Sequence, residues 1–391
     1  MPESHPARMG HPHQSVSTPS APPIYQTTAF DIADLDVLQA MYSGEASGDI
    51  YTRDSNPNHN ALGESIALLE HAEAGAVFAS GMGALGSVFL SLLSAGDHVL
   101  LADSLYGKTV QLVHRLQKAM SLSVSWFSVR NPRAISSLLT DRTRLVLVET
   151  VSNPLLDVAD VPAIAGLLPA SVPLIVDATF TTPILSRPCE QGASVVVHSG
   201  SKYLNGHGDV MLGLAAGRTA FIRSMIETAS VFGQNGNPFE SWLCQRGMRT
   251  LPLRMAQICR TTRELATFFS EQPGISRVHY PLLEQHPTYE TAAKLFPEGT
   301  GGIISIELTR EGRESVNRFF RAAVSLPFSP TLADARTTLS HPASTSHRFL
   351  TDAARTEKGI TEELIRISVG LESADLLKSE FSKALTAANT P

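Results

Sequence analysis

The sequence predicts an α/β protein with a mostly parallel central sheet and a smaller C-terminal α/β domain. Two observations lead to this prediction. From about residue 59, short apolar runs alternate with segments whose apolar residues recur at helical spacing, which is typical of a parallel sheet covered by helices on both faces. After about residue 245 the pattern changes to a long helical segment and further strand-like runs. A chain of 391 residues is long enough for both domains.

The elements of the larger domain are short and follow one another closely. The expected strands are AGAVFAS (74–80), HVLLAD (98–103), SVSWFSV (123–129), RLVLVETV (144–151), VPLIVDAT (172–179) and ASVVVHS (193–199). The expected helices are HNALGESIALLEHAEA (59–74), GMGALGSVFLSLLSAG (81–96), YGKTVQLVHRLQKAM (106–120) and VPAIAGLLPA (161–170). Parallel strands need crossover connections, and helices of this kind supply them.

The C-terminal part begins with the expected long helix RTLPLRMAQICRTTRELATFFSEQ (249–272). GGIISIEL (301–308), AAVSLPF (322–328) and LIRISVGL (364–371) are then strand-like, and the tail from Ser373 is helical again. This order predicts an antiparallel sheet. We find no internal repeat and no long linker, so we expect the two parts to be packed closely.

Composition excludes several classes of protein. A net charge of -6 and a pI near 6.1 give no electrostatic basis for binding nucleic acid or an anionic membrane. No apolar run approaches the roughly 20 residues that span a bilayer. The three cysteines, Cys189, Cys244 and Cys259, contain no CxxC pair, which favours a reducing compartment over a disulfide framework or a thiolate zinc site.

The N-terminal segment MPESHPARMGHPHQSVSTPSAPP is rich in Pro, Ser and His and lacks the apolar core of a signal peptide. We therefore expect a cytoplasmic protein. His5, His11 and His13 are close enough in sequence to bind a metal ion. No carboxylate or cysteine completes a ligand set there, so a polar tail is the preferred interpretation and no metal site is expected.

The stretch VHSGSKYLNGHG (197–208) contains an unusual lysine. Lys202 follows a β-branched run and lies among small and hydroxyl residues. An unpaired buried ammonium costs several kcal/mol or loses its proton. A covalent bond that neutralises Lys202 would explain its position. His198 and His207, in the same stretch, are interpreted as hydrogen-bonding residues rather than catalytic ones.

Residues 81–86 spell GMGALG, a literal GxGxxG motif after a strand and at the start of a helix. Asp103 ends the next strand, near the position of the ribose-binding acid in dinucleotide folds, so an NAD-dependent oxidoreductase is one alternative. A glycine turn at a helix N-terminus is more generally a phosphate site, because free N–H groups and the helix dipole favour an anion. The motif by itself does not identify the phosphate.

Two further residues distinguish these possibilities. Asp177 ends the strand VPLIVDAT, at the sheet edge where open α/β sheets bind ligands. A lysine able to form an imine, an aspartate able to hold a pyridinium nitrogen and a phosphate cup are the parts that a pyridoxal 5'-phosphate site requires. A dehydrogenase needs neither Lys202 nor Asp177. A non-catalytic binding protein is a more distant alternative.

The segment HSGSKYLNGHGDVMLG (198–213) resembles the cofactor-lysine segment of the pyridoxal-phosphate enzymes of cysteine and methionine metabolism. These trans-sulfuration enzymes include cystathionine γ-synthase, cystathionine γ-lyase, methionine γ-lyase and the O-acylhomoserine sulfhydrylases. The resemblance covers roughly residues 20–375. Further matching segments, in order, are PPIYQTTAF, YTRDSNPN, SGMGA, DSLYGKT, VETVSNP, VDATF, RGMRTLPLRM, HPASTSH and LIRISVGLE.

The resemblance implies fold type I, the aspartate-aminotransferase-like fold, and a role for each matching residue. Lys202 would hold the cofactor as an imine and move protons, and Asp177 would pair with the ring nitrogen. The cofactor phosphate would be bound by Ser199, Ser201 and the backbone of Gly81 and Met82. Tyr51 and Arg53 would reach the phosphate of the neighbouring subunit, which implies a dimer with shared sites within a homotetramer.

The remaining roles concern the substrate. Tyr106 would stack on the cofactor ring and assist catalysis. Arg366, assisted by Asn153, would bind the α-carboxylate of an amino-acid substrate. Ser199 and Ser201 as strand-end caps, Tyr106 as a core aromatic residue and Arg366 in a structural ion pair are the alternative readings.

Two departures from the family pattern bear on the substrate. Where cystathionine-handling members usually carry Glu-Ser-Leu-Gly-Gly, this chain reads PTLAD (330–334), so Pro330 replaces the glutamate thought to hold the distal amino group. Thr331 follows it and is expected near the substrate. Lys108 stands beside the stacking tyrosine where glycine or cysteine is common, and either lies near the leaving group or points to solvent. The lysine segment carries Ser201 in place of the usual threonine.

These residues predict a pyridoxal-phosphate enzyme that catalyses γ-elimination or γ-replacement on a homoserine-ester, methionine-like or homocysteine-like amino acid. The two outcomes are left open. A cystathionine synthase or lyase is the alternative within the family, and a β-lyase is a further one. We expect an N-terminal arm at 1–55, a cofactor-binding domain at 56–245 and a C-terminal domain at 246–391.

Overall fold

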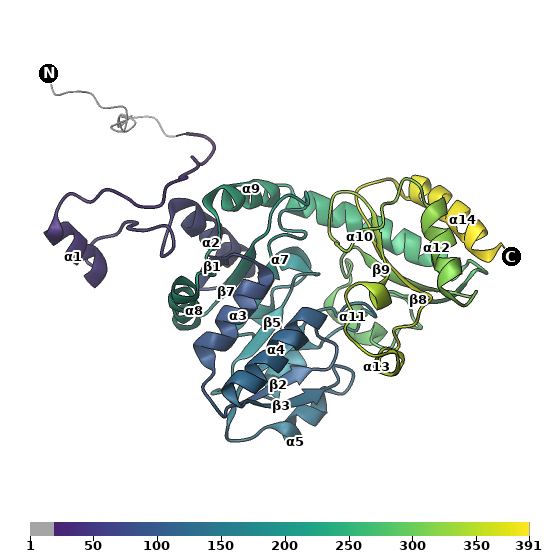
Figure 1. Ribbon diagram of the computed structural model, residues 1–391, viewed down its shortest axis with the longest axis horizontal. Coiled ribbons are helices and arrows are strands. Elements are labelled where there is room, and N and C mark those ends of the chain that lie inside the picture. The colour runs from purple at the N-terminus through teal and green to yellow at the C-terminus, as the bar shows by residue number, and fades with distance from the viewer. Residues whose placement is uncertain (1–18, 391) are drawn as a thin grey trace.

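Two sheets, of seven and four strands, organise the part of the chain that the computed structural model describes, residues 19–390 (Figure 1). His5, His11 and His13 lie outside these residues. The seven strands, in spatial order, are β1 (Ala74–Phe78), β7 (Gly213–Gly217), β6 (Val195–Ser199), β5 (Leu174–Asp177), β4 (Thr143–Glu149), β2 (His98–Ala102) and β3 (Ser123–Phe127).

The larger sheet is mostly parallel, as the sequence predicts. Strands β3, β2, β4, β5 and β6 pair in parallel, whereas β7 pairs antiparallel with both β6 and β1. Strand β7 is not predicted from the sequence, because four of the five residues of GLAAG are glycine or alanine. The small residues have a packing reason: at Gly213 an added Cβ would lie only 2.0 Å from the carbonyl oxygen of Ser80.

Helices cover both faces of this sheet. On one face α2 packs against β1 and β7, and Leu62 and Ile66 share a core with Leu212 and Leu214. On the other face α3 packs against β6, β7 and α8. The helices of this part are α2 (Pro57–Glu70), α3 (Gly81–Leu92), α4 (Gly107–Met120), α5 (Ile135–Leu138), α6 (Val161–Gly166), α7 (Thr182–Leu185), α8 (Thr219–Phe232) and α9 (Pro238–Met248).

The smaller sheet is antiparallel, also as expected. Its strands, in spatial order, are β10 (Thr338–Ser340), β11 (Leu364–Ser368), β9 (Ile303–Leu308) and β8 (Ile275–His279). The helices of this part are α10 (Leu251–Ser270), α11 (Tyr289–Leu295), α12 (Arg313–Ala322), α13 (Asp352–Glu357) and α14 (Ala374–Asn389). Phe269, Phe319 and Phe381 join α10, α12 and α14 in one core.

The strand expected at AAVSLPF (322–328) is wrong. Helix α12 continues to Ala322, and only Phe328 of this run forms a bridge, to Leu339. Ala323 and Leu326 are buried in the core of the smaller sheet without pairing as a strand. Apolar content alone therefore gave a false strand signal, and Pro327 removes a donor that a paired strand would use.

Of the described residues before 55, the part around the helix α1 (Leu35–Ser43) lies away from both sheets (Figure 1), whereas the Pro22 carbonyl accepts the indole N–H of Trp242. Asp34 caps α1 by accepting the N–H of Val37 at 2.9 Å. Leu35 is 80% exposed and Tyr42 71% exposed, so α1 presents apolar side chains to solvent in a single chain. A nine-residue helix of this kind gains little stability by itself.

Two further findings concern the described residues as a whole. Within them, no helix is both long and apolar enough to cross a membrane. The three cysteines are free thiols. The division at residues 55 and 245 remains a prediction.

Candidate active site

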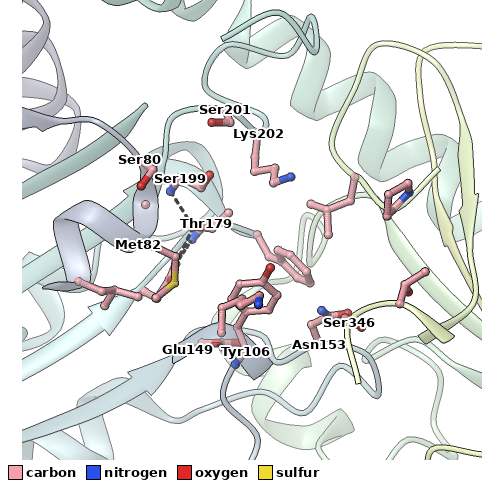
Figure 2. Close-up of a pocket in the computed structure, with 18 of the residues that line it drawn as sticks. Ser80, Met82, Tyr106, Glu149, Asn153, Thr179, Ser199, Ser201, Lys202 and Ser346 are labelled. Carbon is pink, nitrogen blue, oxygen red and sulfur yellow. Dashed lines mark hydrogen bonds between the residues drawn. The ribbon is translucent and has the colours of Figure 1, made fainter. Parts of the chain in front are cut away.

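A cavity of about 650 Å³ lies where the carboxyl ends of β4, β5 and β6 meet the start of α3 and loops of the smaller sheet (Figure 2). Cavities of this size hold small-molecule ligands. The predicted site residues that line it are Gly81, Met82, Tyr106, Lys108, Asn153, Asp177, Ser199, Ser201, Lys202 and Arg366. The chain thus brings together residues from positions 81 to 366.

Three predicted residues lie elsewhere. Thr331 is not among the lining residues, although it contacts both Lys202 and Arg366. Tyr51 and Arg53 are not among the residues that line the cavity of their own chain. The Arg53 guanidinium lies 5.0 Å from the centre of the Tyr51 ring, and Arg53 lines a separate small cavity.

Lys202 lies in the turn that follows β6 and points into the cavity (Figure 2). Its N–H donates to the Ser199 carbonyl at 3.1 Å, which holds the turn against the end of the strand. Its ammonium Nζ donates to Thr331 Oγ1 at 3.3 Å. Burial, and next the charge of Arg366, lower the pKa of Lys202 to about 8. About a tenth of the Lys202 amine is therefore neutral at pH 7, far more than for a lysine of ordinary pKa.

Asp177, the last residue of β5, is held by Thr179. The Thr179 hydroxyl and backbone N–H donate to Asp177 Oδ1 at 2.6 and 3.0 Å. Thr179 Oγ1 also accepts the N–H of Ser199 at 2.9 Å, so one threonine fixes the ends of two strands (Figure 2). Burial raises the pKa of Asp177 above its ordinary value, and the Thr179 bonds offset part of that rise. These bonds favour the ionised carboxylate.

Glu149, the last residue of β4, lies beside Asp177 in the parallel register and also lines the cavity. Its Oε1 accepts the backbone N–H of Tyr106 at 2.5 Å. Sequence analysis missed both Glu149 and Thr179. The signal was present, because neighbouring strands end in VE and VD at equivalent places.

Arg366, in β11, is 4% exposed and forms the floor of the cavity. Its Nη1 donates to Asn153 Oδ1 at 3.1 Å and its Nη2 to the Thr331 carbonyl at 3.0 Å. Among residues 19–390 its Nε has no hydrogen-bond partner. A buried arginine that retains an unpaired donor is suited to bind an anionic ligand.

The start of α3 supplies a phosphate cup. Ser80 caps the helix by accepting the N–H of Gly83 at 3.0 Å, and Gly81 and Met82 line the cavity beside Ser199. A Cβ on Gly81 would lie 3.2 Å from the Cβ of Ser199, so glycine permits this close approach. Ser201 Oγ accepts the N–H of Leu212 at 3.1 Å. The first N–H groups of a helix favour an anion.

Arg254, near the start of α10, holds the loop that follows Lys202. Its guanidinium donates to the carbonyls of Tyr203 and Leu204 at 2.6 and 3.2 Å. Gly206, at φ 76, is packed so closely that an added Cβ would lie 2.1 Å from Arg254 Nη1. The motif RGMRTLPLRM contained Arg254, but sequence analysis gave it no role.

One cavity therefore contains the lysine, the aspartate, the phosphate cup and the buried arginine. The family profile described as Cys/Met metabolism PLP-dependent enzyme matches residues 4–386 of the sequence. The chain belongs to this family. The NAD-dependent alternative for the GMGALG turn is not supported, because the turn faces Lys202 and Ser199 in a chain that matches a pyridoxal-phosphate family.

Relatives within the family differ in their reactions. The chain is 35% identical over 365 residues to the O-succinylhomoserine sulfhydrylase of Pseudomonas aeruginosa, with 93% of this chain and 90% of the relative covered. It is 36% identical over 370 residues to an L-methionine gamma-lyase of Pseudomonas putida, with 94% and 92% covered.

A solved structure in the family has the same fold. The putative O-acetylhomoserine (thiol)-lyase of Campylobacter jejuni superposes with a TM-score of 0.90 at 26% identity, covering 97% of this chain and 98% of that one. It contains a pyridoxyl-lysine monophosphate. The protein is thus a pyridoxal-phosphate enzyme of fold type I, with a mostly parallel sheet and a smaller C-terminal domain, as the sequence predicts.

The residues present fit this cofactor. The cavity offers an amine of lowered pKa on Lys202, a carboxylate on Asp177 and helix N–H groups for the phosphate. Arg366, with its unpaired Nε, provides for a second anion at the other side of Lys202. One cavity thus has separate places for a phosphate and for a carboxylate.

The pKa of Lys202 predicts how cofactor attachment depends on pH. Only the neutral amine attacks an aldehyde, so covalent attachment to cofactor-free protein should accelerate about tenfold between pH 7 and pH 9 and then level off. An ordinary lysine would still accelerate above pH 9, because its pKa lies near 10.5. Stopped-flow absorbance after mixing with pyridoxal phosphate measures the rate. Continued acceleration to pH 10 would show that burial does not lower this pKa.

The same shift has a consequence for stability. The pKa of Lys202 is lower in the folded than in the unfolded protein, so the charged form is disfavoured in the fold below pH 8. Between about pH 8 and pH 10.5 the unfolded chain binds more protons at this site. The contribution of Lys202 to the free energy of unfolding therefore rises with pH in that window.

Proposed function

We propose that the protein catalyses γ-elimination or γ-replacement on a γ-substituted amino acid, such as a homoserine ester or a methionine-like or homocysteine-like thioether. One observation carries this proposal: Lys202 and the buried Arg366 lie in one cavity and both contact Thr331. A carboxylate bound by Arg366 brings the α-carbon of an amino acid near the Lys202 amine. The sulfhydrylase and γ-lyase relatives support a reaction at the γ-carbon.

Each residue has a defined task in this reaction. Pyridoxal phosphate, when bound, supplies an aldehyde for amino groups and a ring that accepts electron density from the α-carbon. Lys202 removes and returns protons through its neutral amine. Asp177 holds the ring nitrogen in its positive form, and Tyr106 stacks on the ring. Arg366 and Asn153 orient the α-carboxylate.

The phosphate contacts come from two sources. Ser199 and Ser201, with the backbone N–H groups of Gly81 and Met82, bind the cofactor phosphate. The family resemblance assigns Tyr51 and Arg53 to the phosphate of a neighbouring subunit. Thr331 fixes the relative position of Lys202 and Arg366 through its hydroxyl and carbonyl oxygens.

The distal part of the cavity favours a neutral or anionic γ-substituent. Lys108 and Arg348 both line the cavity and are exposed, and Lys108 Nζ donates to Gln111 Oε1 at 3.1 Å. Pro330 also lines it, where cystathionine-handling members usually carry a glutamate. Ala333 keeps the left-handed backbone, φ 66, at a position where those members usually have glycine. Position 330 itself therefore has no carboxylate to offer a distal ammonium.

A substrate panel tests this function. We expect O-acetylhomoserine, O-succinylhomoserine, methionine or homocysteine to be turned over faster than cystathionine. Each is assayed with and without a thiol, measuring 2-oxoacid, ammonia and thioether product. A thioether formed only with thiol establishes replacement, and 2-oxoacid without thiol establishes elimination. The γ-reaction proposal fails if cystathionine is the best substrate by kcat/KM and is cleaved to pyruvate, because that product identifies a β-lyase.

Lys108→Gly tests the distal cation. We expect the preference for O-succinylhomoserine over O-acetylhomoserine to fall about two- to fivefold, since an exposed ion pair contributes only about 0.2–1 kcal/mol. Lys118→Gly, on the last turn of α4, is the matched control. Unchanged kcat/KM ratios in the Lys108 variant would place its ammonium in solvent.

We further propose a homodimer with shared sites, arranged as a homotetramer. Met211 lines the cavity yet is 64% exposed, and α1 presents Leu35 and Tyr42 to solvent. These surfaces are suited to contact a second copy, in which Tyr51 and Arg53 would complete the phosphate site. The free thiols support a reducing, cytoplasmic location. The domain division at 55 and 245 is kept as part of this proposal.

Mixing two inactive variants tests the shared site. Arg53→Ala should weaken cofactor binding about 10- to 100-fold, because a charge-assisted phosphate contact is lost. Subunits of Arg53→Ala and Lys202→Ala, dissociated and reassembled together, should recover activity, since one of the two hybrid sites contains both native residues. If the mixture has only the summed activity of its parents, Arg53 serves its own chain.

A further inference from the structure

Glu149 is a buried carboxyl group in the cavity that the proposed reaction does not use. It is 9% exposed at the end of β4, and it lies beside Asp177 in the register of the sheet. Neighbouring strands are about 4.8 Å apart, so two acidic side chains meet in one confined space. Two carboxylates that share such a site are seldom both ionised, because each disfavours the charge of the other.

The surroundings of the two carboxyl groups differ. Asp177 accepts two hydrogen bonds from Thr179, both on Oδ1. Glu149 accepts one, from the backbone N–H of Tyr106. Burial, and next the charge of Asp177, raise the pKa of Glu149 well above its usual range, and only the Tyr106 N–H acts in the opposite direction. Of the two groups, Glu149 is therefore the one that retains a proton.

The hydrogen bond from the Tyr106 N–H to Glu149 fixes the position of Tyr106. Tyr106 is the N-cap residue of α4, and its side chain lines the cavity instead of capping the helix. The phenol ring is 38% exposed, so packing alone leaves it room to move. Glu149 fixes the backbone of Tyr106 to the end of β4. Figure 2 shows the two residues together at one side of the cavity.

We propose that Glu149 is a positioning residue that acts in its neutral form: its carbonyl oxygen holds Tyr106 in place for ring stacking, and its proton leaves Asp177 as the charged partner of the cofactor ring. This inference rests on the stacking role of Tyr106 in the proposed function. Its requirements are specific, because the position needs an acceptor of the right length and no negative charge.

Three variants separate these requirements. Glu149→Gln keeps the carbonyl acceptor and has no charge, whereas Glu149→Ala removes the acceptor. Glu73→Ala is the matched control, because Glu73 Oε2 accepts the N–H of Thr219 at 2.9 Å, at the start of α8 and away from the cavity. For each variant, cofactor-free protein is titrated with pyridoxal phosphate, and the dissociation constant and the visible circular dichroism of the bound cofactor are measured.

We expect Glu149→Gln and Glu73→Ala to bind within about twofold of the native protein and to keep its visible dichroism. Glu149→Ala should bind about tenfold more weakly or worse, because a buried N–H loses its acceptor, and its dichroism should fall as the ring loses a fixed neighbour. If Glu149→Gln is as impaired as Glu149→Ala, the negative charge is needed and the proposal is overturned. The proposal is also overturned if Glu149→Ala binds the cofactor with the native dissociation constant and the native visible dichroism.

A second measurement does not depend on the folding of the alanine variant. Infrared difference spectra of native and Glu149→Gln protein at pH 7, both free of cofactor, should show a protonated carboxyl C=O band that the Gln variant lacks. The absence of that band in the native protein contradicts the neutral form. None of these measurements uses substrate, so they fail or succeed independently of the γ-reaction assays.

Discussion

Lys202→Ala is expected to reduce turnover by about four orders of magnitude or more, because covalent attachment and proton transfer are lost together. The fold should survive, since the Lys202 side chain makes one hydrogen bond, to Thr331, and removing a largely buried ammonium relieves a desolvation cost. Steady-state kcat measured with the preferred substrate, alongside far-ultraviolet circular dichroism, tests both statements.

A chemical control accompanies this variant. Borohydride reduction should fix the mass of the cofactor on Lys202 of the native protein and on no peptide of Lys202→Ala. Lys358→Ala is the matched lysine variant, because Lys358 Nζ donates to the Asp103 carbonyl at 2.8 Å and does not line the cavity. Full activity of Lys202→Ala would refute the assignment of the cofactor lysine.

Asp177→Asn should lower kcat about 100- to 1,000-fold, the usual effect of removing one preorganised charge from an active site. Asparagine retains an oxygen for the two Thr179 donors, so local structure should be preserved. The positive charge on the ring nitrogen loses its partner, and the ring then accepts electron density from the substrate less well. Cofactor binding should weaken as well.

The matched control is Asp160→Asn. Asp160 caps α6 by accepting the N–H of Ala163 at 3.0 Å and lies outside the cavity. This variant should keep its kcat, with at most a small loss of stability. A rate for Asp177→Asn within a few-fold of the native rate would leave Asp177 as a strand-end residue bonded only to Thr179.

Periodicity predicted the larger sheet well because buried parallel strands are continuous apolar runs. The apolar pattern gave the wrong prediction where the composition of a segment does not match the structure it adopts in the fold. Four of the five residues of β7 are glycine or alanine, and Gly213 lies against the start of α3. No local sequence pattern indicates that contact. The run 322–328 has the composition of a strand but forms a turn after α12, in which Ala323 and Leu326 are buried and Val324 and Phe328 are exposed.

Some residues of the candidate site could likewise be predicted from the sequence, and others could not. Lys202 and Asp177 could be predicted, because a charged residue directly after a buried strand is unusual in sequence. Glu149 carries the same signal at the end of β4, whereas Thr179 and Arg254 could not be predicted, because their importance lies in which neighbours they contact. Arg254 contacts carbonyls about 50 positions away. Sequence spacing carries no sign of that contact.

The contacts of Arg254 also connect the larger sheet to the smaller α/β part. The loop after Lys202 follows a strand of the larger sheet, yet Arg254 of α10 holds its carbonyls, and the Tyr203 hydroxyl accepts the N–H of Gly302 beside β9. Arg366 is joined to Asn153 across the same floor. A hinge that opened there would have to break all of these bonds.

One wall of the cavity depends on a glycine at the start of α4. The loop residues that line the cavity are Ser344, Thr345, Ser346, Arg348 and Phe349. A Cβ added to Gly107, at the start of α4, would lie 2.4 Å from the Phe349 ring and 2.8 Å from the Ser346 carbonyl oxygen. Gly107 therefore lets this loop close one wall of the cavity, and a larger residue at position 107 would push that wall outward. Lys202 and Arg366, which both contact Thr331, take no part in this packing.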